Sequence, residues 1–140
     1  MTDAEARALL VADPPHTGKL ATTRKDGRPH VAPIWYTVDD EGSVLFTTGS
    51  DTLKGRTILR DPRVSLCVDD ERPPFAFVIV EGTVEVVEDL AEVRHWAGVI
   101  GGRYMGAGRA GEYGARNGVP GELLCRLRPD HVVAVRNVSD

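Results

Sequence analysis

The chain has 140 residues, a formal net charge of −4, 41% hydrophobic residues and 27% charged residues. This size and composition are typical of a globular protein, so we expect one domain over residues 1–140 and not a disordered chain. The acidic balance argues against general nucleic-acid binding, which depends on clustered cations that neutralise phosphates.

The chain carries no signature of a membrane, metal or side-chain catalytic protein. No apolar run approaches the roughly 18 residues of a membrane span, and the acidic N-terminus lacks an apolar signal core, so we expect a cytoplasmic protein. Cys67 and Cys125 lie in apolar, strand-like runs, where small buried thiols are the commoner interpretation. The four histidines show no ligand or relay spacing. We therefore expect no metal site and no catalytic constellation.

The N-terminal half is predicted to be a short helix followed by a β-meander. Thr2 and Glu5 have the spacing of a capping box, which predicts a helix over Asp3–Leu10. Prolines from Pro14 onward end this helix. The turn signals Asp26-Gly27 and residues 39–42 then separate runs rich in β-branched residues. The expected strands are residues 19–23, 30–38 and 43–48.

The second half is predicted to hold two helices, further strands and a glycine-rich loop. A helix over residues 52–60 has Ser50 or Asp51 as its expected N-cap, and a helix is expected over about 89–100. The remaining expected strands are residues 63–69, 75–87, 122–128 and 131–138. Nine of the fifteen glycines lie within residues 98–121, which favours a compact loop with one helical turn.

The run over residues 75–87 alternates with a period of two. Its even positions are small and apolar, which predicts one face inside a barrel. Its odd positions pass from Phe75, Phe77 and Ile79 to polar residues, and this exposed apolar end predicts burial in a dimer. The strands are grouped and do not alternate with helices, so we expect a mainly β fold, a β-barrel with a few short helices.

The segment from Thr47 to Arg60 is the strongest local signal for a binding site. A strand ends there, and a helix begins whose free N–H groups attract an anion. Hydroxyls and cations surround this helix start, namely Thr47, Thr48, Ser50, Thr52, Lys54, Arg56 and Arg60. A lysine in the first turn opposes the helix dipole by about 0.3–1 kcal/mol, a cost that a bound phosphate would offset. A solvated lysine beside an ordinary cap is the alternative.

Two further features bear on a cofactor. Pro33 lies within an expected strand, where it marks an edge or a bulge, and Trp35 beside it is either a platform for a flat ring or an ordinary core aromatic. The run Gly106–Gly111 fits a dinucleotide fingerprint by letter only, because no strand precedes it and no βαβ unit surrounds it.

Eight short motifs follow one another along nearly the whole chain: Leu20-Ala21-Thr22, Asp26-Gly27-Arg28-Pro29, Pro33-Ile34-Trp35, Leu53-Lys54-Gly55-Arg56, Arg60-Asp61-Pro62-Arg63-Val64, Val80-Glu81-Gly82-Thr83, Gly102-Arg103-Tyr104-Met105-Gly106 and Pro120-Gly121-Glu122-Leu123. In this order, they resemble the pyridoxamine 5′-phosphate oxidase-like split β-barrel flavoproteins, in particular the branch that uses the deazaflavin coenzyme F420.

The resemblance implies a split β-barrel of the FMN-binding type and a homodimer with cofactor sites at the subunit interface. It implies that Lys54 and nearby residues hold the cofactor phosphate, and that Pro33, Ile34 and Trp35 run along the ring system. The residues on the phosphate side are Thr47, Thr48, Ser50, Thr52, Lys54, Gly55 and Arg56. Relatives often carry arginine at the position of Thr52, which leaves more of the binding to Lys54. Arg56 and Arg60 are candidates for the glutamate tail of F420.

The implied function is that of an F420-dependent oxidoreductase. Hydride would pass from the reduced deazaflavin to a conjugated or quinone-like organic acceptor, with Arg103 and Tyr104 as candidates for the substrate side. Two alternatives stay open. One is an FMN-binding reductase or oxidase of the same fold, and the other is a carrier or sensor that binds F420, FMN or haem without turnover.

Overall fold

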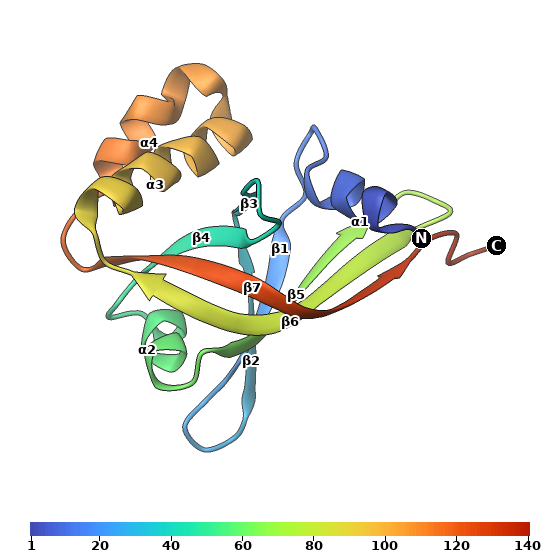
Figure 1. The fold of residues 1–140 in the computed structure, drawn as a ribbon, viewed down its shortest axis with the longest axis horizontal. Coiled ribbons are helices and arrows are strands. Elements are labelled where there is room, and N and C mark those ends of the chain that lie inside the picture. Colours follow the sequence, from blue (N-terminus) through green and yellow to red (C-terminus); the bar gives the residue numbers. More distant parts are fainter.

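A single curled antiparallel sheet of seven strands forms the centre of the computed structural model, which describes residues 1–140 (Figure 1). The strand order is β2-β1-β5-β6-β7-β4-β3. The strands are β1 (Gly18–Thr23), β2 (Pro29–Ile34), β3 (Thr37–Val38), β4 (Val44–Gly49), β5 (Arg63–Asp70), β6 (Ala76–Val87) and β7 (Glu122–Val135). The prediction of a mainly β barrel with a few short helices is confirmed, and the fold is a split β-barrel.

Helices cover the ends and one flank of this sheet (Figure 1). They are α1 (Asp3–Leu10), α2 (Leu53–Arg60), α3 (Leu90–Met105), the 3-10 turn η1 (Ala107–Arg109) and α4 (Ala110–Asn117). The capping box of α1 is confirmed, because the Thr2 hydroxyl accepts from the Glu5 N–H and the Thr2 N–H donates to the Glu5 carboxylate. The predicted start and end of this helix agree with the structure.

The main core lies inside the curl of the sheet. On β6 the even positions Val78, Val80 and Val84 are buried, as the period of two predicts. The helices α1 and α2 add Leu10 and Ile58 to the same core. A smaller cluster lies on the other side of the sheet, where α3 places a buried valine against β4 and β7.

The odd positions of β6 lie on the outer face of the sheet. Register places five side chains side by side there, which we call the outer apolar strip: Cys67, Phe77, Ile79, Val133 and Val135. Phe75, which we expected on the same strand face, instead precedes β6 with a φ of 62°. That left-handed conformation is uncommon for a bulky residue and marks a turn. The turn therefore takes Phe75 out of the strand.

The prediction of a loop over residues 98–121 was wrong. Here α3 continues to Met105, and α4 packs back against it as a helical hairpin. Glycines allow the two helix backbones to approach closely. A Cβ on Gly101 would lie 2.2 Å from Cβ of Tyr113, and a Cβ on Gly118 would lie 2.6 Å from Cβ of Arg94. The glycines thus serve helix packing at these positions, which their density in the sequence does not distinguish from loop flexibility.

Two strand boundaries also differ from the predictions. The expected strand over residues 30–38 is divided into β2 and β3 at Trp35 and Tyr36. The two expected C-terminal strands are one strand, β7, which continues through Pro129. A register shift opposite Glu81 and Gly82 accommodates that proline, since a bulge takes up a residue that cannot donate to the ladder. The other predicted strands agree with the structure to within one residue at each end.

We predict that the glycines of the helical hairpin differ sharply in their tolerance of a methyl group. Gly101→Ala should lower the free energy of unfolding by about 1–3 kcal/mol, because the added Cβ overpacks the contact with Tyr113. Gly111→Ala is the control, since a Cβ there meets nothing within 4 Å and alanine should stabilise α4 by about 0.5–1 kcal/mol. Urea unfolding monitored by circular dichroism measures both. Equal effects would contradict the packing role of Gly101.

Candidate cofactor site

Five of the residues predicted for the cofactor line one cavity of about 240 Å³. Pro33, Ile34 and Trp35 come from the end of β2 and the residue after it, Thr47 from β4, and Lys54 from the first turn of α2. The other lining residues are Ala97, Ile100, Gly101, Tyr113, Asn117 and Glu122. The fold therefore brings the predicted ring side and the predicted phosphate side together, and the α3–α4 hairpin covers them.

Lys54 is the only basic residue in the lining of this cavity. Its side chain is half-buried, and this burial lowers the pKa of the ammonium, although the nearby Cys125 and Glu122 side chains oppose that shift. None of the ion pairs within 4 Å includes Lys54. A partly desolvated cation without a close counter-ion is suited to bind an anionic ligand.

The helix start differs in one respect from the prediction. The N-cap of α2 is Thr52, and neither Ser50 nor Asp51 takes that place. Its hydroxyl accepts from the Gly55 N–H at 3.0 Å, donates to the Gly49 carbonyl at 2.8 Å, and lies 3.1 Å from the Thr48 hydroxyl. The Thr48 and Thr52 hydroxyls are thus occupied within the protein. The prediction missed this cap because three adjacent residues in this turn are all favourable N-caps.

Backbone N–H groups at this helix start remain available. The N–H groups of Leu53 and Lys54 have no hydrogen-bond partner in the chain, whereas that of Arg56 bonds to the Thr52 carbonyl. Gly55 lets α2 approach the sheet, since a Cβ there would lie 2.0 Å from the carbonyl oxygen of Gly49. Unpaired N–H groups beside a lysine are the arrangement that attracts phosphate at a helix start.

Glu122 is a lining residue that the sequence did not single out. It is the first residue of β7 and pairs with Gly49 at the end of β4. Burial raises the pKa of its carboxyl group, while the Thr47 hydroxyl and the Lys54 ammonium lower it. It belongs to the motif Pro120-Gly121-Glu122-Leu123, but that motif does not reveal its place beside Lys54, which depends on the β4–β7 register.

An aromatic cluster forms the ring side of the cavity. Tyr104 stacks on Trp35 with ring centroids 5.0 Å apart and an interplanar angle of 5°, and Tyr113 lies tilted at 5.9 Å. The Tyr104 hydroxyl donates to the His16 carbonyl at 2.6 Å, which fixes its ring. One face of Trp35 is therefore covered by the protein itself. Tyr113 comes from α4, in a segment that was expected to be a loop.

Arg103 lies next to this cluster and binds backbone. Its guanidinium donates to the Tyr36 carbonyl at 2.6 Å and to the Leu10 carbonyl at 2.8 Å, and it lies over the ring of Tyr36. These bonds connect α3 to the C-terminal end of α1. Its assignment to the substrate side, like that of Tyr104, stays a prediction.

Ser50 and Arg56 lie outside the cavity. Ser50 lines a neighbouring hollow, where Glu122 also takes part, and its N–H donates to the Gly121 carbonyl at 2.8 Å. Arg56 is exposed on α2.

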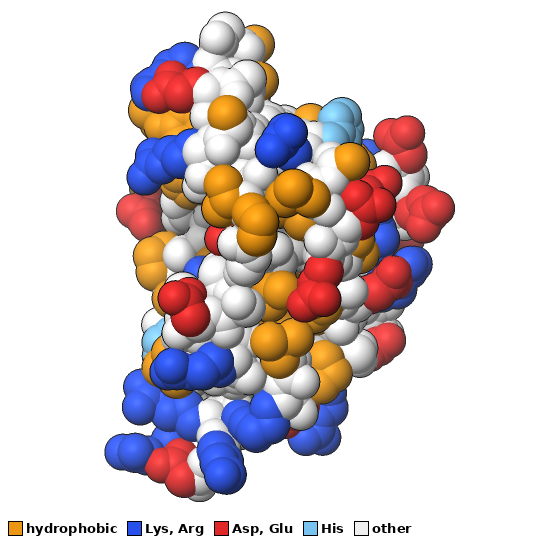
Figure 2. All heavy atoms as spheres, turned by 90° about the vertical axis from the view of Figure 1, so that its left-hand side faces the viewer, with side chains coloured by type: hydrophobic (Ala, Val, Ile, Leu, Met, Phe, Trp, Pro, Cys, Tyr) orange, Lys and Arg blue, Asp and Glu red, His pale blue; other side chains and the backbone are white.

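Figure 2 shows Lys and Arg side chains gathered at the bottom of one face, where the β1–β2 hairpin lies in Figure 1. The exposed cations of the hairpin and α2 are Lys25, Arg28, Arg56, Arg60 and Arg63, the last just after α2.

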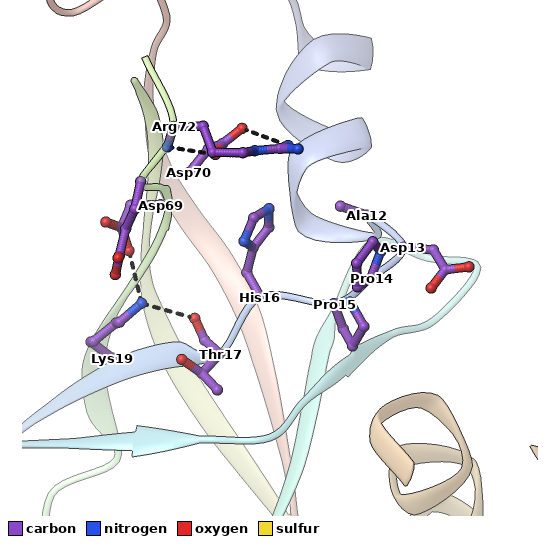
Figure 3. Close-up of a pocket in the computed structure, with 11 residues that line it drawn as sticks. Ala12, Asp13, Pro14, Pro15, His16, Thr17, Lys19, Asp69, Asp70 and Arg72 are labelled. Carbon is purple, nitrogen blue, oxygen red and sulfur yellow. Dashed lines mark hydrogen bonds and ion pairs between the residues drawn. The ribbon is translucent and has the colours of Figure 1, made fainter. Parts of the chain in front are cut away.

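A larger cavity of about 520 Å³ lies elsewhere, between the segment that follows α1 and the end of β5 (Figure 3). Charged side chains dominate it, and they pair with one another: Lys19 with Asp69 at 2.8 Å and Arg72 with Asp70 at 3.1 Å. His16 points between these pairs (Figure 3). Its lining contains no Phe, Tyr or Trp, and both its lysine and its arginine pair with carboxylates, so it has neither the aromatic platform nor the unpaired cation of the smaller cavity. We therefore take the smaller cavity as the candidate site.

We also searched the structure for metal-binding clusters and for membrane-spanning helices. No group of three or more His, Cys, Asp or Glu side chains is arranged to hold a metal ion. No helix combines the length and the apolar character that a membrane crossing requires.

The curled split barrel thus places a half-buried lysine at a helix start in one cavity with Trp35. The family model described as pyridoxamine 5′-phosphate oxidase matches residues 2–136. The chain belongs to the pyridoxamine 5′-phosphate oxidase family, whose members share an oxidoreductase-type character and this split-barrel fold.

The individual proteins that resemble this chain share only about a quarter to a third of its residues in the matched regions. A 5a,11a-dehydrotetracycline/5a,11a-dehydrooxytetracycline reductase of Streptomyces rimosus is 32% identical over 77 residues, which are 50% of this chain and 54% of that protein. The chain thus matches about half the length of this curated relative. Among solved structures, the conserved hypothetical protein Rv2991 of Mycobacterium tuberculosis has a TM-score of 0.84 and 25% identity, over 100% of this chain and 89% of that chain. A structure named F420 Reductase has a TM-score of 0.71 and 27% identity, over 91% of this chain and 94% of that chain.

We predict that Arg103 stabilises the fold through its bonds to backbone carbonyls. Arg103→Ala should lower the free energy of unfolding by about 2–3 kcal/mol, because it leaves half-buried carbonyls without a charged donor. Arg109→Ala is the control. It removes an exposed ion pair with Glu112, and such pairs contribute about 0–1 kcal/mol. Denaturant unfolding measures both variants, and an Arg103 variant as stable as the wild type would contradict this role.

Proposed function

We propose that the chain is an F420-dependent oxidoreductase that reduces a conjugated or quinone-like organic acceptor. The observation that carries the proposal is the cavity in which Pro33, Ile34 and Trp35 face Lys54. The family match and the similarity to a structure named F420 Reductase support the choice of cofactor. When bound, the deazaflavin supplies the hydride, and the chain supplies binding, orientation and exclusion of water.

Lys54 and the free N–H groups of Leu53 and Lys54 hold the cofactor phosphate in this proposal. The ammonium is half-buried and has no ion pair within the chain, so a phosphate oxygen gives it a partner that the protein does not. Thr47 is the only one of the predicted threonines that lines the cavity, and Thr48 and Thr52, which lie outside its lining, bond to each other. The exposed Arg56 and Arg60 offer charge to the glutamate tail of F420.

The segment Pro33-Ile34-Trp35 orients the ring system. Trp35 keeps 39% of its surface exposed, although Tyr104 covers one of its faces. This rigid stack presents an aromatic surface at the edge of the cavity. The cavity of about 240 Å³ is smaller than the roughly 300–1,000 Å³ of common ligand pockets, so one chain encloses only part of the cofactor. The proposal therefore includes a second chain that completes the site.

The outer apolar strip is the surface we propose for this homodimer. Its five residues come from three adjacent strands and form a continuous apolar patch on the outer face of the sheet. Val133 and Val135 are each 37% exposed, and a patch of this kind on a sheet face is typical of an interface. A dimer formed there buries the strip and brings a second chain close to each cavity.

FMN is the second candidate cofactor, and a specific observation favours it. Lys54 and the free N–H groups of Leu53 and Lys54 would pair with the phosphate of FMN as well as with that of F420. A non-catalytic carrier is the third candidate, supported by the absence of a catalytic side-chain constellation. Oxidation of reduced F420 by acceptor panels separates the first candidate from the third.

We predict that Lys54→Ala weakens F420 binding by about 10- to 100-fold, because a hydrogen bond to a charged group contributes about 1.5–3 kcal/mol. Fluorescence titration of the wild type and the variant with F420, FMN and pyridoxal phosphate measures the effect. Lys25→Ala is the matched control, since it removes the same charge from the exposed β1–β2 turn. Unchanged affinity for every ligand in the Lys54 variant would refute the phosphate site.

We also predict that Val133→Glu dissociates the dimer, because it places a charge in the middle of the outer apolar strip. Val99→Glu is a control of equal exposure, since both valines are 37% exposed and Val99 lies on α3. Analytical ultracentrifugation gives the mass of each species. A monomeric wild type, or equal dissociation by both variants, would exclude this interface. Weaker F420 binding by the Val133 variant alone would tie the cofactor site to the dimer.

A further inference from the structure

Lys54 does not face the cavity alone, because Glu122 lines the same cavity from the start of β7. Their charges interact, since each shifts the pKa of the other toward its charged form. They nevertheless form no ion pair within 4 Å. The carboxylate is thus close enough to act on a ligand held by Lys54 but does not occupy the lysine itself.

The charged and titratable groups around Glu122 are few. Lys54 faces it from α2, Asp51 from the turn before α2, Cys125 from β7 and Tyr113 from α4. Cys125 is buried, and burial raises the pKa of its thiol to about 12, so it stays neutral.

No other cation lines the cavity, although the Arg109 and Arg116 guanidinium groups lie over the ring of Tyr113, at 5.2 and 5.6 Å from its centroid. The lining residues from α3 are uncharged, namely Ala97, Ile100 and Gly101. Glu88 lines the hollow on the other side of Glu122 and is exposed. The cavity therefore holds one positive and one negative charge when Glu122 is ionised, and further acidic groups lie near its edge.

Glu122 repels a ligand in proportion to the negative charge of that ligand, and this repulsion opposes the attraction by Lys54. A phosphodiester carries one negative charge, whereas a phosphomonoester carries close to two at pH 7, because its second pKa is about 6. The Coulomb energy between Glu122 and the ligand scales with that charge, so the repulsion is twice as large for the monoester. Because affinity depends exponentially on free energy, doubling the repulsion energy squares the factor by which Glu122 weakens binding.

We propose that Glu122 shifts the selectivity of this cavity toward a ligand with a phosphodiester and away from a ligand with a phosphomonoester. The inference rests on the proposed function, since it takes Lys54 as the partner of the ligand phosphate. F420, whose phosphate links the ring side chain to the lactyl tail, is a phosphodiester. FMN and pyridoxal phosphate are monoesters. Glu122 thereby determines specificity among cofactors that share one binding mode.

The selection depends on pH. Burial raises the pKa of Glu122, so its charge is lost on acidification earlier than that of an exposed carboxylate. Protonation of Glu122 should therefore strengthen FMN binding as the pH falls, because it removes the repulsion of the FMN phosphate. F420 affinity should rise less, since its phosphate keeps one charge throughout. In the Glu122→Gln variant, the only remaining pH-dependent change in FMN affinity is the one caused by protonation of the FMN phosphate itself.

The test compares three ligands that carry zero, one and two charges at the phosphate position. They are the phosphate-free deazaflavin riboside, F420 and FMN, titrated at pH 8 against the wild type, Glu122→Gln and Glu92→Gln. Glu122→Gln should strengthen F420 binding about fivefold and FMN binding about 25-fold, the square of that factor, and leave the riboside unchanged. Glu92, exposed in the first turn of α3, controls for the change in net charge.

Equal factors for F420 and FMN, or the same gain for the riboside, would overturn the inference. The pH profile of FMN binding to the wild type is a second measurement, which applies even if Glu122→Gln folds poorly. If FMN affinity changed with pH only through protonation of the FMN phosphate, that result would also overturn the inference. If Lys54→Ala loses F420 binding while Glu122→Gln changes nothing, only this inference fails. If the wild type binds none of the three ligands, the proposed function fails with it.

Discussion

The antiparallel ladder of β7 with β4 on one side and β6 on the other is the constraint on which the rest of the structure depends. Its register sets Glu122 opposite Gly49, where β4 ends and α2 is about to begin. The same strand runs along β6 for most of its length and curls the sheet around the core. A slip by one residue would turn every side chain of β7 to the opposite face. The lysine and the carboxylate of the cavity would then no longer face each other.

The α3–α4 hairpin adds the second wall of the site through small residues. Gly101 lets α4 approach until Tyr113 lies against α3, and Tyr113 in turn lies beside Trp35. Arg103 fixes the hairpin to the end of α1 through backbone carbonyls. A cavity with one desolvated cation and an aromatic edge needs both walls, because either wall alone would leave Lys54 in water, where its charge would be screened.

Much of the candidate site could be predicted from the sequence because its parts are local. Lys54 at a helix start and Pro33 before Trp35 are readable as short patterns, and the structure brings them into one cavity. The hydroxyls were harder to assign. Thr48 and Thr52 look available in the sequence, but they bond to each other and to backbone. Whether a hydroxyl is free depends on the fold of its turn, which composition does not describe.

The sequence by itself determined the strands β1, β4, β5 and β6, the capping box at Thr2 and the two-residue period of β6, because neighbouring residues and turn chemistry decide such features. Only the tertiary structure decided the fate of the glycine-rich segment and the place of Glu122. The same glycines suit a flexible loop or two closely packed helices, and a second helix settles which is stable. Glu122 acquires its neighbours through pairing with a strand more than 70 residues earlier in the chain. Such long-range contacts leave no local pattern in the sequence.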